Sequence, residues 1–150
     1  MKKGFTLVEL LVVVAILGVL AAVGIVSFGG FLTNSKENTA RSNHKQICTW
    51  IQTEVTRCQL GDAQIKLGDS THSCNSQTIT PLYESWFASH LDSEWKNPYD
   101  PSKKSADAND ECSDNLGQIN IDNSDDDMCL KIQTKVKKDE PCLVCNVCRD

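Results

Sequence analysis

An apolar run near the N-terminus constrains this chain more strongly than any other feature. Residues 10–35 contain no ionisable side chain, and residues 10–28 are almost wholly aliphatic. A helix over that aliphatic part would be about 28 Å long at ~1.5 Å of rise per residue, close to the thickness of a bilayer's hydrocarbon core. We therefore expect one membrane-spanning helix, followed by a polar outer domain.

The carboxylate of Glu9 stands at the start of this run and needs an explanation. Its neighbours, residues 6–8 and 10–11, leave no polar, solvent-exposed face on a helix. A charge at the centre of a membrane helix costs on the order of 3 kcal/mol, and a charge near its end costs less. One interpretation is a stray glutamate that reaches the lipid headgroups. The interpretation we favour is a residue that has a specific partner.

The cysteines indicate an oxidising compartment for the outer domain. All eight follow the apolar run, and an even number on one side of a membrane anchor favours disulfides. Lys2 and Lys3 before the run, and an acidic domain after it, orient the N-terminus towards the cytoplasm. The formal net charge of −5 argues against a general nucleic-acid binder. The eight cysteines are Cys48, Cys58, Cys74, Cys112, Cys129, Cys142, Cys145 and Cys148.

The stretch KKGFTLVELLVVVAILGVLAA closely resembles the type IV prepilin leader that pilins and type II secretion pseudopilins share. The resemblance rests on a short basic leader, Gly4, Phe5 and Glu9. A secretory signal peptide has its small cleavage-site residue after the apolar core, whereas Gly4 precedes it. The resemblance implies cleavage between Gly4 and Phe5 by a prepilin peptidase, followed by N-methylation of Phe5.

The same resemblance implies a mode of assembly. Cleaved subunits pass from the bacterial inner membrane into a helical filament with other pilins, and the apolar helices pack in its centre. There the Glu9 carboxylate pairs with the Phe5 ammonium of a neighbouring subunit, and the cost of an unmet charge fixes the stagger between subunits. The implied partners are other pilin copies, the prepilin peptidase, an inner-membrane assembly platform and, before assembly, membrane lipid.

The implied organisation has three parts. Residues 1–4 form the cleaved leader, residues 5–32 the transmembrane and assembly half of the helix, and residues 33–150 an extracytoplasmic globular domain. The implied fold is the α+β type IV pilin fold, in which a long N-terminal helix, half of it transmembrane, packs on a small antiparallel β-sheet in a disulfide-rich outer domain. The protein would be single-pass in the inner membrane, with its C-terminal domain outside, and extracellular after assembly into a pilus.

The residue pattern predicts the main elements of the outer domain. An apolar stripe at 3.6-residue spacing extends the first helix to about fifty residues in total, and residues 80–95 form a second, short helix. Residues 117–122 and 128–136 alternate apolar and polar side chains, which predicts an antiparallel hairpin. The polar stretch 68–77 is expected to be a loop. The stripe consists of Ala40, His44, Ile47, Cys48, Ile51, Val55 and Cys58.

The spacing of the cysteines limits their pairing without determining it. Cys48 and Cys58 would lie about 15 Å apart along a helix, too far for a disulfide, so each must pair elsewhere. Cys74 is a plausible partner for Cys58, and Cys129 points away from the helix, towards either Cys112 or the C-terminal tail. Our preferred set is Cys58–Cys74 and Cys112–Cys129, with Cys48 and the tail cysteines forming the other two bonds.

The tail CLVCNVC, residues 142–148, has the Cys-x-x-Cys spacing of zinc and redox sites. In an extracytoplasmic domain the same cysteines favour disulfides. We therefore expect no metal site here, and a membrane-tethered redox or metal protein is kept as a rival hypothesis. By resemblance, a C-terminal region clamped by a disulfide is common in type IV pilins.

Two charged segments each have an ordinary and a functional interpretation. Asp122, Ser124 and Asp126 have the alternate spacing of a calcium loop, but the glycine and glutamate of an EF-hand are absent, so a solvated acidic turn is preferred. Residues 100–111 are a second calcium candidate by resemblance to major pseudopilins. Four lysines form either a protected strand edge, which we prefer, or a DNA-contacting face. These are Lys131, Lys135, Lys137 and Lys138.

No catalytic constellation emerges, because His72 and His90 have no nucleophile motif beside them. We expect a structural protein without a cofactor: a type IV pilus subunit serving motility, adhesion or DNA uptake. The alternative is a pseudopilin of a type II secretion system. It is favoured by WKNPYD, which resembles the Trp-Gly-Asn-Pro-Tyr segment of major pseudopilins, with Lys96 in place of the glycine. In either case Asn97 and Pro98 indicate a turn.

Overall fold

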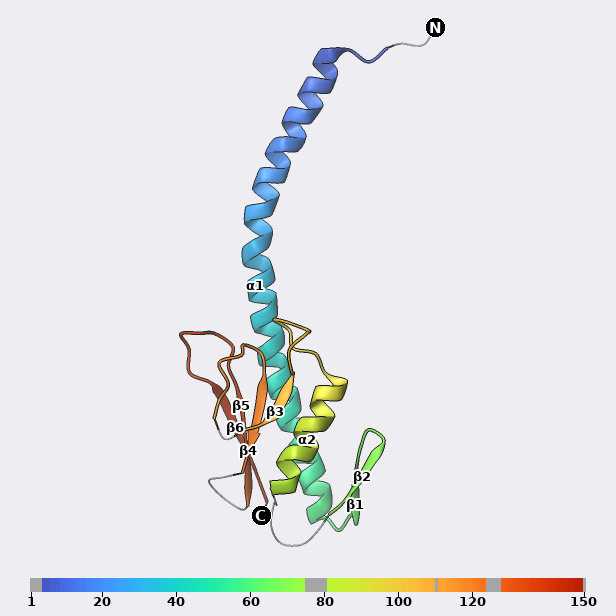
Figure 1. Cartoon of the computed structure of the whole chain (residues 1–150), viewed down its shortest axis with the longest axis vertical. Coiled ribbons are helices and arrows are strands. Elements are labelled where there is room, and N and C mark those ends of the chain that lie inside the picture. The colour runs from blue at the N-terminus through green and yellow to red at the C-terminus, as the bar shows by residue number, and fades with distance from the viewer. Residues whose placement is uncertain (1–3, 75–80, 110, 124–127, 150) are drawn as a thin grey trace. The chain divides into compact units, whose positions relative to one another are not determined.

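The computed structural model describes residues 4–74, 81–109, 111–123 and 128–149 (Figure 1). The chain divides into two compact units, Met1–Ser35 and Lys36–Asp150. Helix α1, Leu7–Gln59, contributes to both units, and its 53 residues confirm the expected long helix. The remaining helix and all six strands belong to the second unit.

The second half of α1 buries the predicted stripe. Ala40, Ile47, Ile51 and Val55 are each no more than 3% exposed, and the other members of the stripe are buried or half-buried. The helix then ends at a glycine in a left-handed conformation: Gly61 has a φ of 104° and donates its N–H to the Cys58 carbonyl. The apolar periodicity therefore identified both the helix and its buried face.

A β-hairpin follows α1 where the sequence suggested only a polar loop. Strands β1, Gln64–Leu67, and β2, Ser70–Ser73, pair antiparallel with Leu67 opposite Ser70. Gly68, with a φ of 60°, supplies the conformation that a two-residue hairpin turn requires. The loop prediction for residues 68–77 is thus wrong over Ser70–Ser73. Alternation in β1, where Ile65 and Leu67 are buried, stabilises the hairpin against the core.

The second helix, α2, spans Pro81–Glu94 and confirms the predicted short helix. Pro81 occupies the first helical position, where its missing N–H costs nothing. The proposed capping residue Thr80 lies outside the described residues. Phe87 and Leu91 are buried and point into the core of the second unit.

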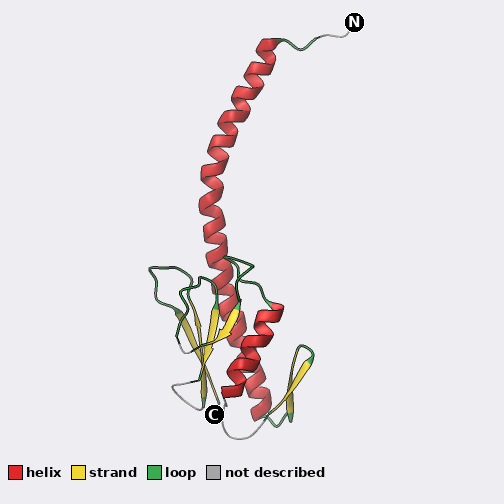
Figure 2. Ribbon diagram, in the orientation of Figure 1, coloured by secondary structure: helices red, strands yellow, loops and turns green. Residues whose placement is uncertain are grey.

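A four-stranded sheet in the order β3-β4-β5-β6 completes the second unit (Figure 2). The predicted hairpin is confirmed as the antiparallel pair β4 and β5. The expectation of an antiparallel sheet fails at one edge, because β3 pairs parallel to β4. The segment between them, residues 109–118, returns the chain to the starting end of β3. The strands are β3 Ala106–Ala108, β4 Ile119–Asp122, β5 Cys129–Thr134 and β6 Leu143–Cys148.

One core joins these elements. Side chains from α1, α2, the hairpin and the inner face of the sheet form a single buried cluster. On the sheet, Ile121, Leu130 and Ile132 are completely buried, which is the face that the alternating pattern predicted. The second unit therefore forms a buried core of its own within one chain, although Leu60 and Val144 stay exposed.

The predicted turn at Asn97 and Pro98 also forms. The side-chain oxygen Oδ1 of buried Asn97 accepts a hydrogen bond of 2.9 Å from the Tyr99 N–H, and the Tyr99 hydroxyl donates to the Val136 carbonyl at 2.6 Å. Gly117 packs against this turn with a φ of 78°, and a Cβ there would lie 2.8 Å from a Tyr99 ring carbon. Only glycine fits at that position.

Candidate functional site

The apolar half of α1 is exposed in the single chain. Among the described residues of 5–32, all are exposed apart from the half-buried Gly24, and Phe5, Leu7 and Ile25 each keep more than 70% of their surface exposed. Fully burying one such side chain is worth about 1.5–3 kcal/mol, so this surface strongly favours an apolar environment. The helix is long and apolar enough to cross a membrane, which fits membrane anchoring.

Glu9 has local partners at the start of this helix. Its Oε2 accepts hydrogen bonds from the Thr6 N–H at 2.8 Å and the Thr6 hydroxyl at 2.7 Å, and its own N–H donates to the Thr6 Oγ1 at 3.3 Å. Since α1 begins at Leu7, Thr6 is the N-cap and Glu9 the third helical residue, which is the reciprocal arrangement of a capping box. The Glu9 carboxylate is therefore neither stray nor unsatisfied within a single subunit.

Sequence reasoning missed this capping box, although the signal was present. Thr-x-x-Glu directly before an apolar run is its usual sequence signature. The geometry gives Glu9 a role in starting the helix, and this role is separate from any role in contacts between subunits. The two roles need different substitutions to tell them apart.

Gly4 and Phe5, the residues on either side of the predicted cleavage point, precede the helix. Both are exposed and lie in irregular backbone, two or more residues before α1 begins. A Cβ built on Gly4 would meet no atom within 4 Å, so nothing within the described chain requires glycine there. Any requirement for glycine at this position must come from another molecule.

Four disulfides hold the second unit together, and they use all eight cysteines. Cys58–Cys74 forms as expected. The preferred Cys112–Cys129 bond is wrong, so Cys48 and the three tail cysteines do not form two bonds among themselves, and only Cys48–Cys145 of that group forms. The alternative in which Cys129 pairs with the tail is confirmed by Cys129–Cys148. The four bonds are Cys48–Cys145, Cys58–Cys74, Cys112–Cys142 and Cys129–Cys148.

Strand β6 explains why each tail cysteine has a different partner. Successive strand residues point to opposite faces, so Cys145 lies on the inner face with Val147 and reaches Cys48 on α1. Cys148 lies on the outer face directly opposite Cys129 in the β5–β6 register, with Cα atoms 4.0 Å apart. Cys129 faces away from the helix, as predicted. Because β5 and β6 align it with Cys148, it bonds to that tail cysteine, and Cys112 bonds to Cys142.

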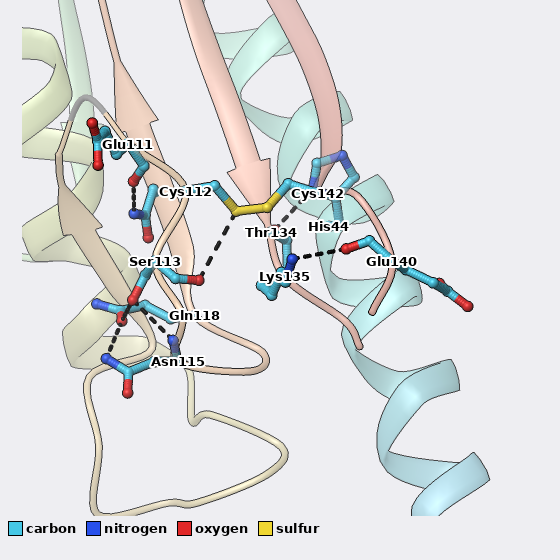
Figure 3. The surroundings of a disulfide bond; sticks show 11 residues. His44, Glu111, Cys112, Ser113, Asn115, Gln118, Thr134, Lys135, Glu140 and Cys142 are labelled. Carbon is cyan, nitrogen blue, oxygen red and sulfur yellow. Dashed lines mark hydrogen bonds between the residues drawn. A yellow bond between two sulfur atoms is a disulfide. The ribbon is translucent and has the colours of Figure 1, made fainter. Parts of the chain in front are cut away.

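The Cys112–Cys142 bond joins two loops that are otherwise held by hydrogen bonds (Figure 3). On one side, the Ser113 hydroxyl donates to the Gln118 Oε1 at 2.9 Å. On the other, the Lys135 Nζ donates to the Glu140 carbonyl at 2.8 Å. The disulfide therefore fastens the loop before β4 to the connection between β5 and β6.

These pairings remove the basis of the redox or metal hypothesis for the tail. Cys142, Cys145 and Cys148 each bond to a residue outside CLVCNVC, so the motif contains no internal disulfide to exchange. Cys48 and Cys145 do lie close to His44, but their sulfurs are bonded to each other, and metal ligation needs a thiolate.

His44 is buried on the inner side of the second unit. Its Nδ1 lies 2.9 Å from the Thr134 hydroxyl and its Nε2 lies 3.6 Å from the Cys48 sulfur. Burial lowers the pKa of His44 below its ordinary value. His44 is therefore a structural histidine whose ring nitrogens both have partners, as the sequence suggested.

Two of the four lysines on and after β5, Lys135 and Lys137, bond to groups within the chain. Lys137 forms ion pairs with Glu37 at 3.0 Å and Glu140 at 3.5 Å, and Arg41 also pairs with Glu140. The hydrogen bond to Glu37 raises the pKa of Lys137, and the hydrogen bond from Arg41 lowers the pKa of Glu140. The strand-edge interpretation is wrong, because β5 lies between β4 and β6 in the sheet. Lys137 and Lys135 bond to groups within the chain instead.

The two calcium candidates differ in how far the structure describes them. Asp122 is buried at the end of β4, whereas Ser124 and Asp126 lie outside the described residues. In the other segment, Asp100 accepts hydrogen bonds from Ser102 and Asp107 pairs with Lys104 at 3.1 Å. Two carboxylates of that segment, Asp100 and Asp107, thus have partners within the chain, and calcium binding stays an untested prediction.

Comparison with known proteins identifies the N-terminal segment. Residues 1–25 match the prokaryotic N-terminal methylation motif. The type IV major pilin protein PilA of Myxococcus xanthus is 49% identical over 48 residues, which cover 32% of this chain and 22% of that protein. A type IV major fimbrial protein FimA of Dichelobacter nodosus is 32% identical over 84 residues, covering 52% of this chain and 54% of that protein.

A second FimA protein of the same organism is 42% identical over 53 residues, covering 35% of this chain and 34% of that protein. The chain therefore spans between about a fifth and about half of the length of these relatives. No solved structure matches the chain significantly. The N-terminal motif and these relatives show that the first part of the chain is similar to type IV pilins.

Proposed function

We propose that this chain is the structural subunit of a type IV pilus filament. The observation that carries the proposal is the contrast between an exposed apolar helix and a domain with a closed core of its own. Similarity to type IV major pilins supports the same conclusion. The protein acts through assembly and has no catalytic role.

Before assembly, residues 5–32 cross the bacterial inner membrane and residues 33–150 fold outside it. A prepilin peptidase removes residues 1–4 by cleaving the peptide bond between Gly4 and Phe5, and Phe5 is then methylated. The exposed, irregular backbone at this point suits entry into a peptidase site. An inner-membrane platform then transfers the apolar helix from lipid into the filament core, where other copies bury it.

Within the filament, Glu9 has a second role beside helix capping. The carboxylate has two oxygens, and both hydrogen bonds that it accepts from Thr6 use Oε2. A carboxylate accepts more than two hydrogen bonds, so Glu9 can keep its cap and still receive the ammonium of Phe5 from a neighbouring subunit. In an apolar core an unmet carboxylate is costly, so this contact selects the stagger between subunits.

The pseudopilin alternative is not favoured. The WKNPYD segment that suggested it serves a structural turn, because Asn97 and Tyr99 bond to the neighbouring backbone and to Val136. The relatives described above are major pilins and fimbrial proteins.

Deletion of the gene separates the two functions. We expect the deletion strain to lose long surface fibres, as seen by electron microscopy, and to export folded proteins normally. Complementation with the intact chain should restore the fibres. Retained exoproteins in a strain with normal surface fibres would favour the pseudopilin instead.

A further inference from the structure

Two neighbouring cavities lie between α2 and the β1–β2 hairpin, and one of them is also lined by α1. The first has a volume of about 370 Å³ and is lined by Trp50, Gly68, His90, Glu94 and Trp95. The second, of about 390 Å³, shares Gly68, His90 and Glu94 with the first and extends along the hairpin to Asp69. Both volumes are within the usual range of small-molecule sites, ~300–1,000 Å³. Nothing in the assembly role of the chain uses either cavity.

Aromatic rings form much of the first cavity. Trp50 lies edge-on to Phe87 with ring centroids 5.4 Å apart, and it lies 5.3 Å from the His90 ring. Trp95 follows α2 directly and is half-buried. Gly68 lets the hairpin approach, because a Cβ there would lie 3.3 Å from the Nδ1 of His90. Two indoles and an imidazole are thus gathered around one space.

The formal charges of the lining are all negative. Glu94 borders both cavities and Asp69 borders the second, and neither has an ion pair within the described residues. Neither lining includes a lysine or an arginine, as far as the described residues go. A cation would meet a carboxylate without an ion pair and aromatic rings around the same space, whereas an anion would meet no lysine or arginine in either lining.

We propose that the Trp50–Trp95 cavity binds an alkylated ammonium group, such as that of choline. Indole is the strongest cation–π partner among the side chains, and aromatic cages with an acidic residue recognise quaternary ammonium ions. Glu94 supplies the charge, and the second cavity, with the hydroxyls of Ser89 and Ser93, receives the hydroxyl-bearing part of the ligand. This inference does not depend on the proposed pilus function.

Tryptophan fluorescence reports on this site directly, because each of the chain's three tryptophans lines a cavity. Trp50 and Trp95 line the first cavity, and Trp86 lines the second. The full chain would be kept in a maltoside detergent, which has no ammonium group. It would be titrated with choline chloride, tetramethylammonium chloride, phosphocholine and 3,3-dimethylbutan-1-ol, the uncharged isostere of choline. Sodium chloride at equal ionic strength serves as the salt control.

We expect saturable fluorescence changes with choline and tetramethylammonium. The uncharged isostere should bind at least about tenfold more weakly, because it lacks the cation–π and charge terms. Phosphocholine should bind more weakly than choline, because its phosphate meets the same carboxylates. Equal binding of choline and its isostere, tighter binding of phosphocholine, or no saturable change with choline would each overturn the proposal.

Two variants and one control test the position of the site. Glu94→Gln should weaken choline binding about fivefold or more, while Asp114→Asn, which removes another exposed carboxylate before β4, should leave it within twofold. Trp50→Leu should weaken binding while keeping an apolar side chain against Phe87, and its thermal unfolding would be measured in parallel. Equal weakening by Glu94→Gln and Asp114→Asn would show a general effect of net charge and would contradict a site at Glu94.

Discussion

The two units of this chain differ in whether their apolar side chains are exposed or buried. In Met1–Ser35 no described side chain is buried, and the sequence offers no cysteine to cross-link. In Lys36–Asp150 a single core collects side chains from both helices and both sheets, and four disulfides tie it together. The first unit needs lipid or other copies to cover it, whereas the second is complete within one chain.

This difference separates assembly from folding. A substitution in the first unit should change cleavage, membrane insertion or filament yield and leave the outer domain folded. A substitution in the second unit should change the free energy of unfolding of that domain.

Replacing the glycine before the cleavage point should abolish filaments. In Gly4→Val we expect an uncleaved precursor that stays in the membrane, because the peptidase no longer accepts the residue before Phe5. Immunoblots for the longer form and electron microscopy for fibres provide the measurement. Gly18→Ala is the matched control for cleavage, since a Cβ at Gly18 also meets no atom within 4 Å. Normal cleavage and fibres in Gly4→Val would contradict the leader assignment.

Glu9→Gln and Thr6→Ala should separate charge from capping. Glutamine can still complete the capping box, so Glu9→Gln keeps the helix start and loses only the charge. Thr6→Ala loses the cap, at a cost of about 0.5–2 kcal/mol, and keeps the charge. If the ion pair directs assembly, Glu9→Gln should be cleaved normally and give far fewer filaments, while Thr6→Ala should assemble nearly as well as the unmodified chain. The reverse order of filament yields would assign Glu9 to capping alone.

Removing the disulfide between α1 and β6 should destabilise the outer domain and leave cleavage unchanged. Cys48–Cys145 closes a sequence separation of 97 residues, against 16 for Cys58–Cys74. The chain-entropy model gives losses of roughly 5 and about 3 kcal/mol for the two bonds. Thermal unfolding followed by tryptophan fluorescence would compare Cys48→Ser/Cys145→Ser with Cys58→Ser/Cys74→Ser. A smaller loss for the longer loop would show that strain or local packing outweighs loop entropy here.

The smallest effect should come from His44. Because burial lowers its pKa in the folded domain, the unfolded chain binds the proton first as the pH falls, so stability is present above the ordinary histidine pKa of about 6.5 and is lost below it. Unfolding measured between pH 7.5 and 5.5 should show this loss in the unmodified chain and a weaker one in His44→Gln. Over that range Glu140, whose pKa is lowered, stays ionised and does not contribute. An identical pH dependence in both proteins would rule out His44 as its source.

Periodic features of the fold were predictable from sequence, and features set by register were not. The stripe through Ile47 and Ile51 and the alternation around Ile121 and Ile132 each repeat often enough to indicate a helix or a strand. The pairing of Cys129 with Cys148 depends on the alignment of β5 with β6, which no local pattern encodes. Strand β6 itself was hidden, because the cysteines of CLVCNVC recur every three residues and do not follow the two-residue alternation of a strand.

The candidate site shows the same division. Gly4, Phe5 and Glu9 were recognisable because they form a short motif beside an apolar run. The hydrogen bonds from Thr6 to Glu9 were also predictable from local spacing. The Trp50–Trp95 cavity was not, because it needs α1, α2 and the hairpin to meet, and the hairpin depends on a positive φ at Gly68.

The most direct test of the whole account is the intact mass of subunits from purified filaments, together with sequencing of their N-terminus. The account predicts a chain that begins at Phe5 with one added methyl group, so that a charged terminus lies four residues before Glu9 and the entire apolar helix remains. A subunit that begins at Met1, or at a residue beyond the aliphatic run, would contradict it.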